Sequence, residues 1–145
     1  MRCLLRPLAP SIAAALLGAL LGTLGIAMTA PAHAATPAEL LAGYQGQAGA
    51  PPRPERGQQL FTTPAKLGLQ LSCASCHGAL PTKTSTHPLS DKPIAALAPA
   101  FNPVRFTDAD KVERYFRLNC KEVFARDCSA AEKADVLSWL MSLKP

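Results

Sequence analysis

Two cysteines and a histidine carry the most specific chemistry in this chain, in the order C-x-x-C-H at Cys73, Cys76 and His77. This spacing is the attachment signature of a c-type haem. Two thiols one helical turn apart add to the two vinyl groups of the porphyrin, and the adjacent imidazole binds the iron from the proximal side. The motif therefore predicts one covalent haem c held by Cys73 and Cys76, with His77 as an iron ligand.

Two other uses of a C-x-x-C pair fit the rest of the chain less well. A tetrahedral zinc site usually needs a second close pair of ligands. The next cysteines, Cys120 and Cys128, have seven residues between them and no neighbouring histidine. A thioredoxin-like redox pair would lie in a βαβ pattern, and none is visible. The sequence therefore predicts a cytochrome c, and the open question is what its iron does.

Residues 1–34 have the pattern of a cleaved export signal. Arg2 and Arg6 form a positively charged start, the run 12–28 is apolar, and the A-x-A pattern at 32–34 fits a cleavage site near Ala34. Removing 34 of the 145 residues leaves 111, enough for one cytochrome c domain over residues 35–145. We expect a periplasmic protein whose mature chain does not span the membrane.

The mature chain is close to neutral once the haem is counted. Loss of Arg2 and Arg6 lowers Lys+Arg from 15 to 13 against 10 Asp+Glu, a net charge of +3. Two haem propionates bring this to about +1, which does not suggest nucleic-acid binding. One stretch is locally basic, and it either steers an acidic redox partner or is an ordinary solvated helix face: Lys111, Arg114, Arg117 and Lys121.

Helix signals dominate the secondary structure. Thr36, Pro37 and Glu39 form a capping box with proline at the first helical position, and this helix should end at Gly43 or Gly46. Further helices are expected over about 55–61, after the cap at 107–108, and after the capping box of Ser129 and Glu132. Gly57 and Phe61 share one helix face and should cross the last helix near three apolar residues: Val136, Trp139 and Leu140.

Between the motif and the later helices, residues 78–106 contain five prolines and little periodicity. A loop of this length usually argues against an assignment, but here the haem supplies an apolar surface for it to cover. Leu89, Ile94 and Leu97 are the expected lining residues. No strand is predicted. The fold class is therefore all-α, a small class I-type cytochrome c fold around one haem.

The distal iron ligand is not a methionine of the usual kind. Met1 and Met28 leave with the signal, and Met141, near the C-terminus, is interpreted as peripheral packing. The remaining candidates are His87, Asn119, a lysine or an open position. A lone histidine on a proline-rich loop is more often solvated, and asparagine is common near helix C-termini. Asn119 shares the apolar helix face of Val112, Tyr115 and Phe116, so the residues alone leave the choice close to even.

Several segments resemble the sphaeroides haem protein family of class I-type cytochromes c. They cover essentially all of the mature chain, and the Arg-x-Asn-Cys run is the most diagnostic: 36–49, 96–99, 102–108, 111–113, 117–120, 126–128 and 132–140. The resemblance implies that Asn119 binds the ferric iron as sixth ligand and that the neighbouring cysteine is disulfide-bonded. It also implies that reduction frees Asn119, so that ferrous iron binds oxygen, nitric oxide or similar ligands. The implied electron donors are a dihaem cytochrome c and a membrane cytochrome b. His87 is not a recognised feature of that family.

Since haem attachment uses the other pair, Cys120 and Cys128 are expected to form a disulfide. An amide oxygen is a hard donor that suits ferric better than ferrous iron, which gives the resemblance a physical basis. The sequence therefore predicts a monohaem cytochrome c with a distal site that opens on reduction. The alternatives are a simple low-spin electron shuttle, with bis-histidine or other ligation, and a gas-reactive enzyme such as a nitric oxide dioxygenase or minor oxidase.

Overall fold

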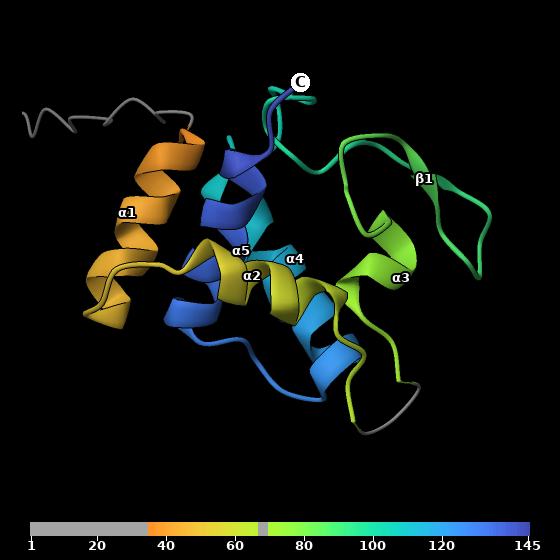
Figure 1. The fold of residues 1–145 in the computed structure, drawn as a ribbon, viewed down its shortest axis with the longest axis horizontal. Coiled ribbons are helices and arrows are strands. Elements are labelled where there is room, and N and C mark those ends of the chain that lie inside the picture. Colours follow the sequence, from red (N-terminus) through yellow and green to blue (C-terminus); the bar gives the residue numbers. More distant parts are fainter. Residues whose placement is uncertain (1–34, 67–69) are drawn as a thin grey trace, which may run out of the picture. The chain divides into compact units, whose positions relative to one another are not determined.

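The computed structural model describes residues 35–66 and 70–145, so the expected signal segment lies outside the described residues. The described chain is mainly helical, which confirms the predicted all-α class (Figure 1). None of its helices is long and apolar enough to cross a membrane. The elements are, in order, α1 (Pro37–Ala48), α2 (Pro54–Thr62), α3 (Cys73–His77), β1 (Ser85–Thr86), β2 (Pro93–Ile94), α4 (Ala109–Phe124) and α5 (Ala130–Ser142).

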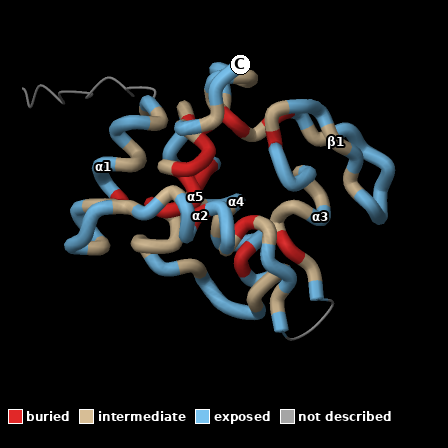
Figure 2. The backbone as a smooth tube through the Cα atoms, in the orientation of Figure 1, coloured by how far each residue is buried: buried red, intermediate tan, exposed pale blue. Residues whose placement is uncertain are grey.

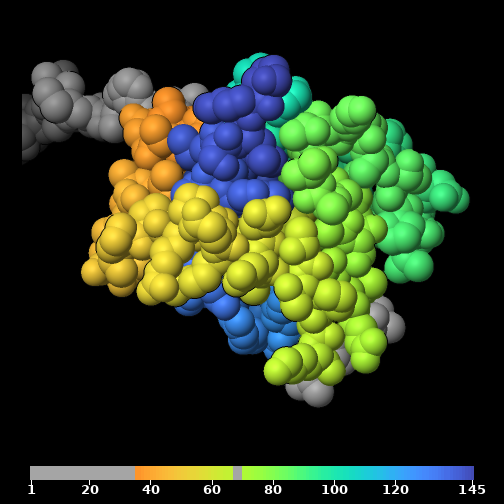
Figure 3. All heavy atoms as spheres, viewed as in Figure 1, coloured from red at the N-terminus to blue at the C-terminus, as the bar shows by residue number. Residues whose placement is uncertain are grey.

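The last helix, α5, is the centre of the core. Most of its inward-facing residues are buried, among them Leu137 and Leu140, and Figure 2 shows buried residues concentrated along it. Helices α2 and α1 pack closely against α5, and Figure 3 shows α2 lying across it. Met141 lies at the edge of this core, in agreement with its interpretation as peripheral packing. Burial of this apolar surface is the main source of the fold's stability.

The crossing of α2 and α5 is close enough to bring their backbones into contact. A Cβ atom at Gly57 would lie 2.1 Å from the Asp135 carbonyl oxygen and 2.8 Å from the Val136 nitrogen. One turn further along α2, the buried Phe61 ring lies 5.0 Å from the Trp139 ring, centroid to centroid. The predicted contact between Gly57, Phe61 and the closing helix is therefore confirmed.

A buried carboxylate fixes the angle of this crossing. Asp135 is 3% exposed, and it accepts hydrogen bonds from the Arg53 backbone nitrogen at 2.6 Å and from Arg56 Nε at 2.7 Å. Arg56 also forms an ion pair with Asp135. Burial of an unpaired charge would cost several kcal/mol, so these partners are what make Asp135 tolerable at this position.

Local capping explains where the helices begin and end. The capping boxes of Thr36 and Ser129 are both present, and Asp108 caps α4 by accepting from the Lys111 nitrogen at 2.9 Å. The predicted end of α1 was wrong, because α1 continues to Ala48 and is closed by Gly49 at φ 65°. A glycine inside a helix costs only about 1 kcal/mol, which the packing of Tyr44 on the core outweighs.

The proline-rich segment after the motif is held by hydrogen bonds to its own backbone. β1 and β2 form a two-residue antiparallel ladder, which was not predicted because so short a strand shows no alternating pattern. The Pro81 carbonyl accepts from the nitrogens of Leu97 and Ala98 at 3.0 and 3.1 Å. Arg105 Nε donates to the Ala96 carbonyl at 3.1 Å. The segment is thus an ordered arm beside α3.

Gly57→Ala should destabilise the protein by about 2–3 kcal/mol or more, because the added methyl group meets backbone atoms of α5 that cannot move aside. Urea unfolding of the holoprotein measures the change. Gly46→Ala is the matched control, since nothing lies within 4 Å of a Cβ at Gly46. This control should stabilise α1 by about 0.5–1 kcal/mol. Equal effects of the two substitutions would contradict the close crossing.

Candidate haem site

The C-x-x-C-H motif forms a helix of its own, α3. The Ser72 nitrogen donates to Ser75 Oγ at 3.0 Å at its start, and Gly78 ends it at φ 76°. Within this single turn Cys73 and Cys76 are three residues apart, so their side chains project from one face. Neither cysteine is paired in a disulfide, so both sulfurs are available for attachment. This is the arrangement that attachment to two vinyl groups of one porphyrin requires.

The surroundings of both cysteines disfavour the thiolate form before attachment. Burial raises the pKa of Cys73 to about 11, and burial followed by the charge of Glu122 raises the pKa of Cys76. Among the described residues no three His, Cys, Asp or Glu side chains converge as metal ligands.

His77 is held in the form that binds metals. Burial, and after it the positive charge of Arg105, lowers the pKa of His77, so the imidazole is neutral at physiological pH. Neutral imidazole is the ligating form of histidine. The centroid of the His77 ring lies 6.1 Å from that of Phe61, so His77 lies beside a side chain of the core.

A cavity of about 230 Å³ lies beside Cys76 and is lined mainly by apolar surface: Leu71, Cys76, His87, Pro88, Leu89 and Glu122. Leu89 lines this cavity but is 82% exposed, whereas Leu97 packs against the core, so the predicted lining of the haem by these residues stays a prediction. His87 Nδ1 accepts from the Leu89 nitrogen at 3.3 Å. His87 is therefore close to the attachment motif and not simply a solvated loop residue.

Asn119 is exposed, although the sequence places it on the apolar face of its helix with Val112 and Phe116. The buried stripe of α4 is centred on Val112, Phe116 and Cys120, and Asn119 lies at its edge, one turn after the exposed Tyr115. Glu122, three residues after Asn119, lines the cavity beside Cys76. Residues three apart on a helix share a face, so Asn119 lies on the same side of α4 as Glu122.

The predicted disulfide between Cys120 and Cys128 is present, with a Cα–Cα distance of 5.7 Å. It joins the C-terminal turn of α4 to the segment before α5. Arg126 and Glu132 form an ion pair at 2.6 Å in the same connection, and hydrogen bonding from Arg126 lowers the pKa of Glu132 to about 2. Asn119 therefore immediately precedes a covalently fixed point.

Two glutamates of α4, Glu122 and Glu113, were not predicted to have a role. Glu122 lines the cavity, and its spacing from Asn119 was the available signal. Glu113 on α4 is bonded to Tyr44 and Lys133. No local pattern indicates such a contact, because Tyr44 is 69 residues away in sequence.

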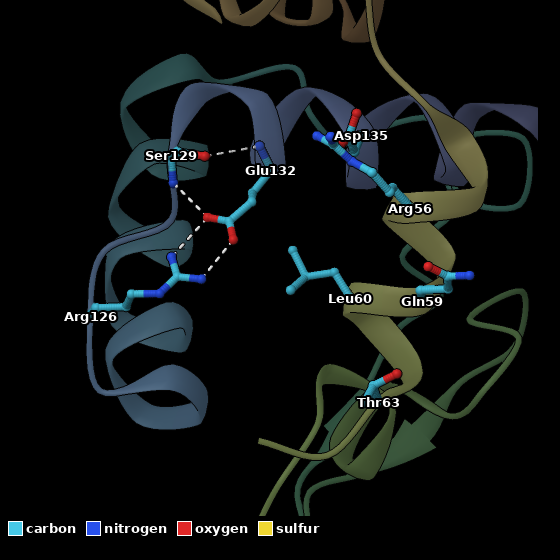
Figure 4. Close-up of a pocket in the computed structure, with 8 residues that line it drawn as sticks. All are labelled: Arg56, Gln59, Leu60, Thr63, Arg126, Ser129, Glu132 and Asp135. Carbon is cyan, nitrogen blue, oxygen red and sulfur yellow. Dashed lines mark hydrogen bonds and ion pairs between the residues drawn. The ribbon is translucent and has the colours of Figure 1, made fainter. Parts of the chain in front are cut away.

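A larger groove, of about 630 Å³, lies between α2 and the start of α5 (Figure 4). Its two arginines, Arg56 and Arg126, are each engaged by a carboxylate, Asp135 and Glu132 respectively. None of its lining residues belongs to the motif or to the cavity beside Cys76. The larger of these two cavities is therefore not the one beside the haem-attachment motif.

The residues present fit a covalently attached haem: two thiols one turn apart, a neutral imidazole beside them, and an apolar cavity next to Cys76. The fold and this donor set define a class I-type cytochrome c with one haem.

Comparison with known proteins identifies the family. Residues 47–140 match the family described as a domain of unknown function, DUF1924. The cytochrome c-type protein SHP of Cereibacter sphaeroides is 46% identical over 107 residues, covering 72% of this chain and 82% of SHP. The chain therefore belongs to the DUF1924 family and is a close homologue of SHP. The predicted resemblance and the single haem are confirmed.

Solved structures agree with this assignment. The structure of oxidised SHP, an oxygen-binding cytochrome c, superposes with a TM-score of 0.71 at 44% identity, covering 74% of this chain and 97% of that one. Oxidised cytochrome c'' of Methylophilus methylotrophus gives a TM-score of 0.69 at 31% identity, covering 75% and 95%. A solution structure of cytochrome c'', concerned with haem-ligand detachment, gives 0.67 at 31%, covering 75% and 94%.

Proposed function

We propose that this protein is a periplasmic monohaem cytochrome c that accepts electrons from another cytochrome and binds a diatomic gas at the iron position that Asn119 leaves on reduction. The carrying observation is the placement of Asn119. It lies directly before a disulfide and three residues before Glu122, which lines the cavity beside Cys76. The export-signal pattern of residues 1–34 and the disulfide support the periplasmic location.

The attachment is proposed at three residues. Cys73 and Cys76 hold the haem through thioether bonds, and the neutral His77 is the proximal ligand. When bound, the haem supplies an iron that alternates between ferric and ferrous states and takes a sixth ligand.

Asn119 provides the redox dependence. Its amide oxygen is a neutral, hard donor that favours ferric over ferrous iron, so Asn119 departs when the iron is reduced. A methionine thioether would hold both states, and the one described methionine, Met141, belongs to the core edge. SHP is described as an oxygen-binding cytochrome c, and haem-ligand detachment is the subject of the cytochrome c'' solution structure. Both relatives support a displaceable distal ligand here.

Electron entry is proposed at the basic side of α4. Four exposed cationic residues lie away from its buried stripe: Lys111, Arg114, Arg117 and Lys121. Such a surface attracts an acidic partner and accelerates association. A dihaem cytochrome c or a membrane cytochrome b, as the family resemblance implies, is the proposed donor.

A second candidate is a bis-histidine electron shuttle with His87 as the distal ligand. The observation that favours it is the position of His87 in the cavity beside Cys76. A bis-histidine site would keep the iron low-spin in both oxidation states and would not bind a gas, the opposite of what release of Asn119 predicts.

We expect haem to remain bound to Cys73 and Cys76 after denaturation, because thioether bonds survive unfolding. Tryptic digestion and mass spectrometry should find haem on a peptide that contains both cysteines. Exchange of both cysteines for alanine should abolish attachment, whereas Ser75→Ala should retain it. Release of the haem into acidified acetone would contradict covalent attachment.

Asn119→Ala should change the ferric absorption spectrum and speed anion binding to ferric iron, because a protein ligand no longer has to leave first. The ferrous wild-type protein should bind carbon monoxide rapidly. His87→Ala is the matched control and should alter neither property. A low-spin ferrous spectrum insensitive to carbon monoxide, together with a response only to His87→Ala, would favour the bis-histidine shuttle.

Charge reversal on the basic side of α4 should slow reduction by an acidic dihaem cytochrome c. Lys111→Glu combined with Arg114→Glu is expected to lower the second-order rate constant about tenfold at low ionic strength. The difference should shrink above ~0.5 M salt, where the Debye length is only a few ångströms. Lys144→Glu, at an exposed lysine near the C-terminus and outside α4, is the control. Wild-type rates that do not vary with salt would contradict steering.

A further inference from the structure

Three helices meet at the carboxylate of Glu113. The Tyr44 hydroxyl, on α1, donates to Glu113 Oε1 at 2.6 Å. Lys133 Nζ, on α5, donates to Glu113 Oε2 at 2.6 Å. Glu113 itself belongs to α4. We call Tyr44, Glu113 and Lys133 the Glu113 anchor.

The Glu113 anchor is well ordered by its surroundings. Tyr44 is 3% exposed, and the Lys133 side chain is 18% exposed. Lys133 Nζ lies 5.5 Å from the centroid of the Tyr44 ring and 5.9 Å from that of Phe116, and these two rings meet edge to face. Cation–π and edge-to-face contacts add directional attraction to the hydrogen bonds.

At neutral pH the protonation states of Tyr44 and Glu113 preserve the hydrogen bonds of the Glu113 anchor. Burial, and after it the hydrogen bond to Glu113, raises the pKa of Tyr44, so the phenol retains its proton. Burial alone would raise the pKa of Glu113, but hydrogen bonds from Lys133 and Tyr44 lower it below its usual value. The tyrosine therefore donates and the carboxylate accepts throughout the physiological range.

Helix α4 depends on such side-chain contacts more than the other long helices do. The close helix pairs are α2 with α5 and α1 with α5, and α4 forms no comparably close pair in the described chain. Along α4, Glu113 lies about 9 Å before Asn119 at 1.5 Å per residue, and Cys120 follows Asn119 directly. Asn119 is thus placed between the Glu113 anchor and the disulfide.

We propose that Tyr44, Glu113 and Lys133 are positioning residues that hold α4 so that Asn119 reaches the ferric iron, and that they thereby set how readily Asn119 is displaced. None of the three binds the haem or the gas. When α4 is held less firmly, the state in which Asn119 is detached becomes more populated, and a ligand that needs this state binds faster. The inference rests on the proposed function, in which Asn119 is the sixth ligand.

The experiment uses the ferric holoprotein and the variants Lys133→Met and Tyr44→Phe, which remove one hydrogen bond each and keep most of the side-chain volume. Cyanide binding, followed by stopped-flow absorbance, must wait for Asn119 to leave. Both variants should bind cyanide about two- to tenfold faster than wild type, the range expected for coupled neighbouring contacts. Carbon monoxide binding to the ferrous protein should not change, because Asn119 has already departed.

A structural readout independent of ligand binding accompanies the rates. Backbone amides of α4 should exchange with deuterium faster in both variants, while those of α2 should not. Arg56→Gln is the matched control, because it removes the ion pair with Asp135 between α2 and α5. It should lower the free energy of unfolding and leave the cyanide rate at the wild-type value.

Asn119→Ala distinguishes failure of the proposed function from failure of the positioning role. If this substitution leaves ferric cyanide binding unchanged, Asn119 is not the sixth ligand and the proposed function is wrong in that respect. If it speeds cyanide binding while Lys133→Met and Tyr44→Phe match wild type, the positioning role is overturned. Support for the inference requires one more result: Lys133→Met should add nothing in the Asn119→Ala background.

Discussion

The backbone contact between Gly57 and Asp135 is the constraint on which the rest of the structure depends. It allows α2 to approach α5 closely enough for Phe61 to lie against Trp139. Phe61 also lies beside the His77 ring, so the same side chain that completes the core defines the surroundings of the proposed proximal ligand. The crossing of α2 and α5 thus helps to determine where α3 lies. Burial of His77 beside Phe61 lowers the pKa of His77 and keeps its imidazole neutral.

The two proposed iron ligands are supported in different ways. His77 follows two attachment cysteines on a helix that contacts α2, next to the densest part of the core. Asn119 lies on α4, which is held by side-chain contacts and a disulfide instead of a close helix crossing. A haem protein that exchanges one axial ligand and keeps the other needs this asymmetry. In this chain the difference lies in the contacts of the helices that carry the two proposed ligands.

The sequence predicted the features that depend on local spacing. The C-x-x-C-H turn, the capping boxes at Thr36 and Ser129, and the glycine at the crossing are each defined by a few neighbouring residues. It misplaced the end of α1, where packing of Tyr44 outweighs helix-breaking glycines. It missed the two-residue strands, which carry no periodic signal.

The exposed position of Asn119 was missed for a different reason. A helical period assigns a face but not its boundary, and Asn119 lies at the edge of the buried stripe. No local sequence pattern could predict the Glu113 anchor, because its three residues come from three helices and Tyr44 is distant in sequence from Glu113. Such contacts are determined by tertiary packing, which sequence periodicity does not encode.

The choice of a carboxylate to fix α4 is informative in itself. Glu113 is 45% exposed, and ion pairs at that exposure contribute at most about 1 kcal/mol to stability. An apolar side chain buried at this position would stabilise the fold at least as well. What a carboxylate adds is direction, because two donors from different helices, Tyr44 and Lys133, must approach its two oxygens along defined lines. The Glu113 anchor is therefore better suited to holding α4 in register than to stabilising it, and register is what the proposed displaceable ligand, Asn119, would require six residues further along the helix.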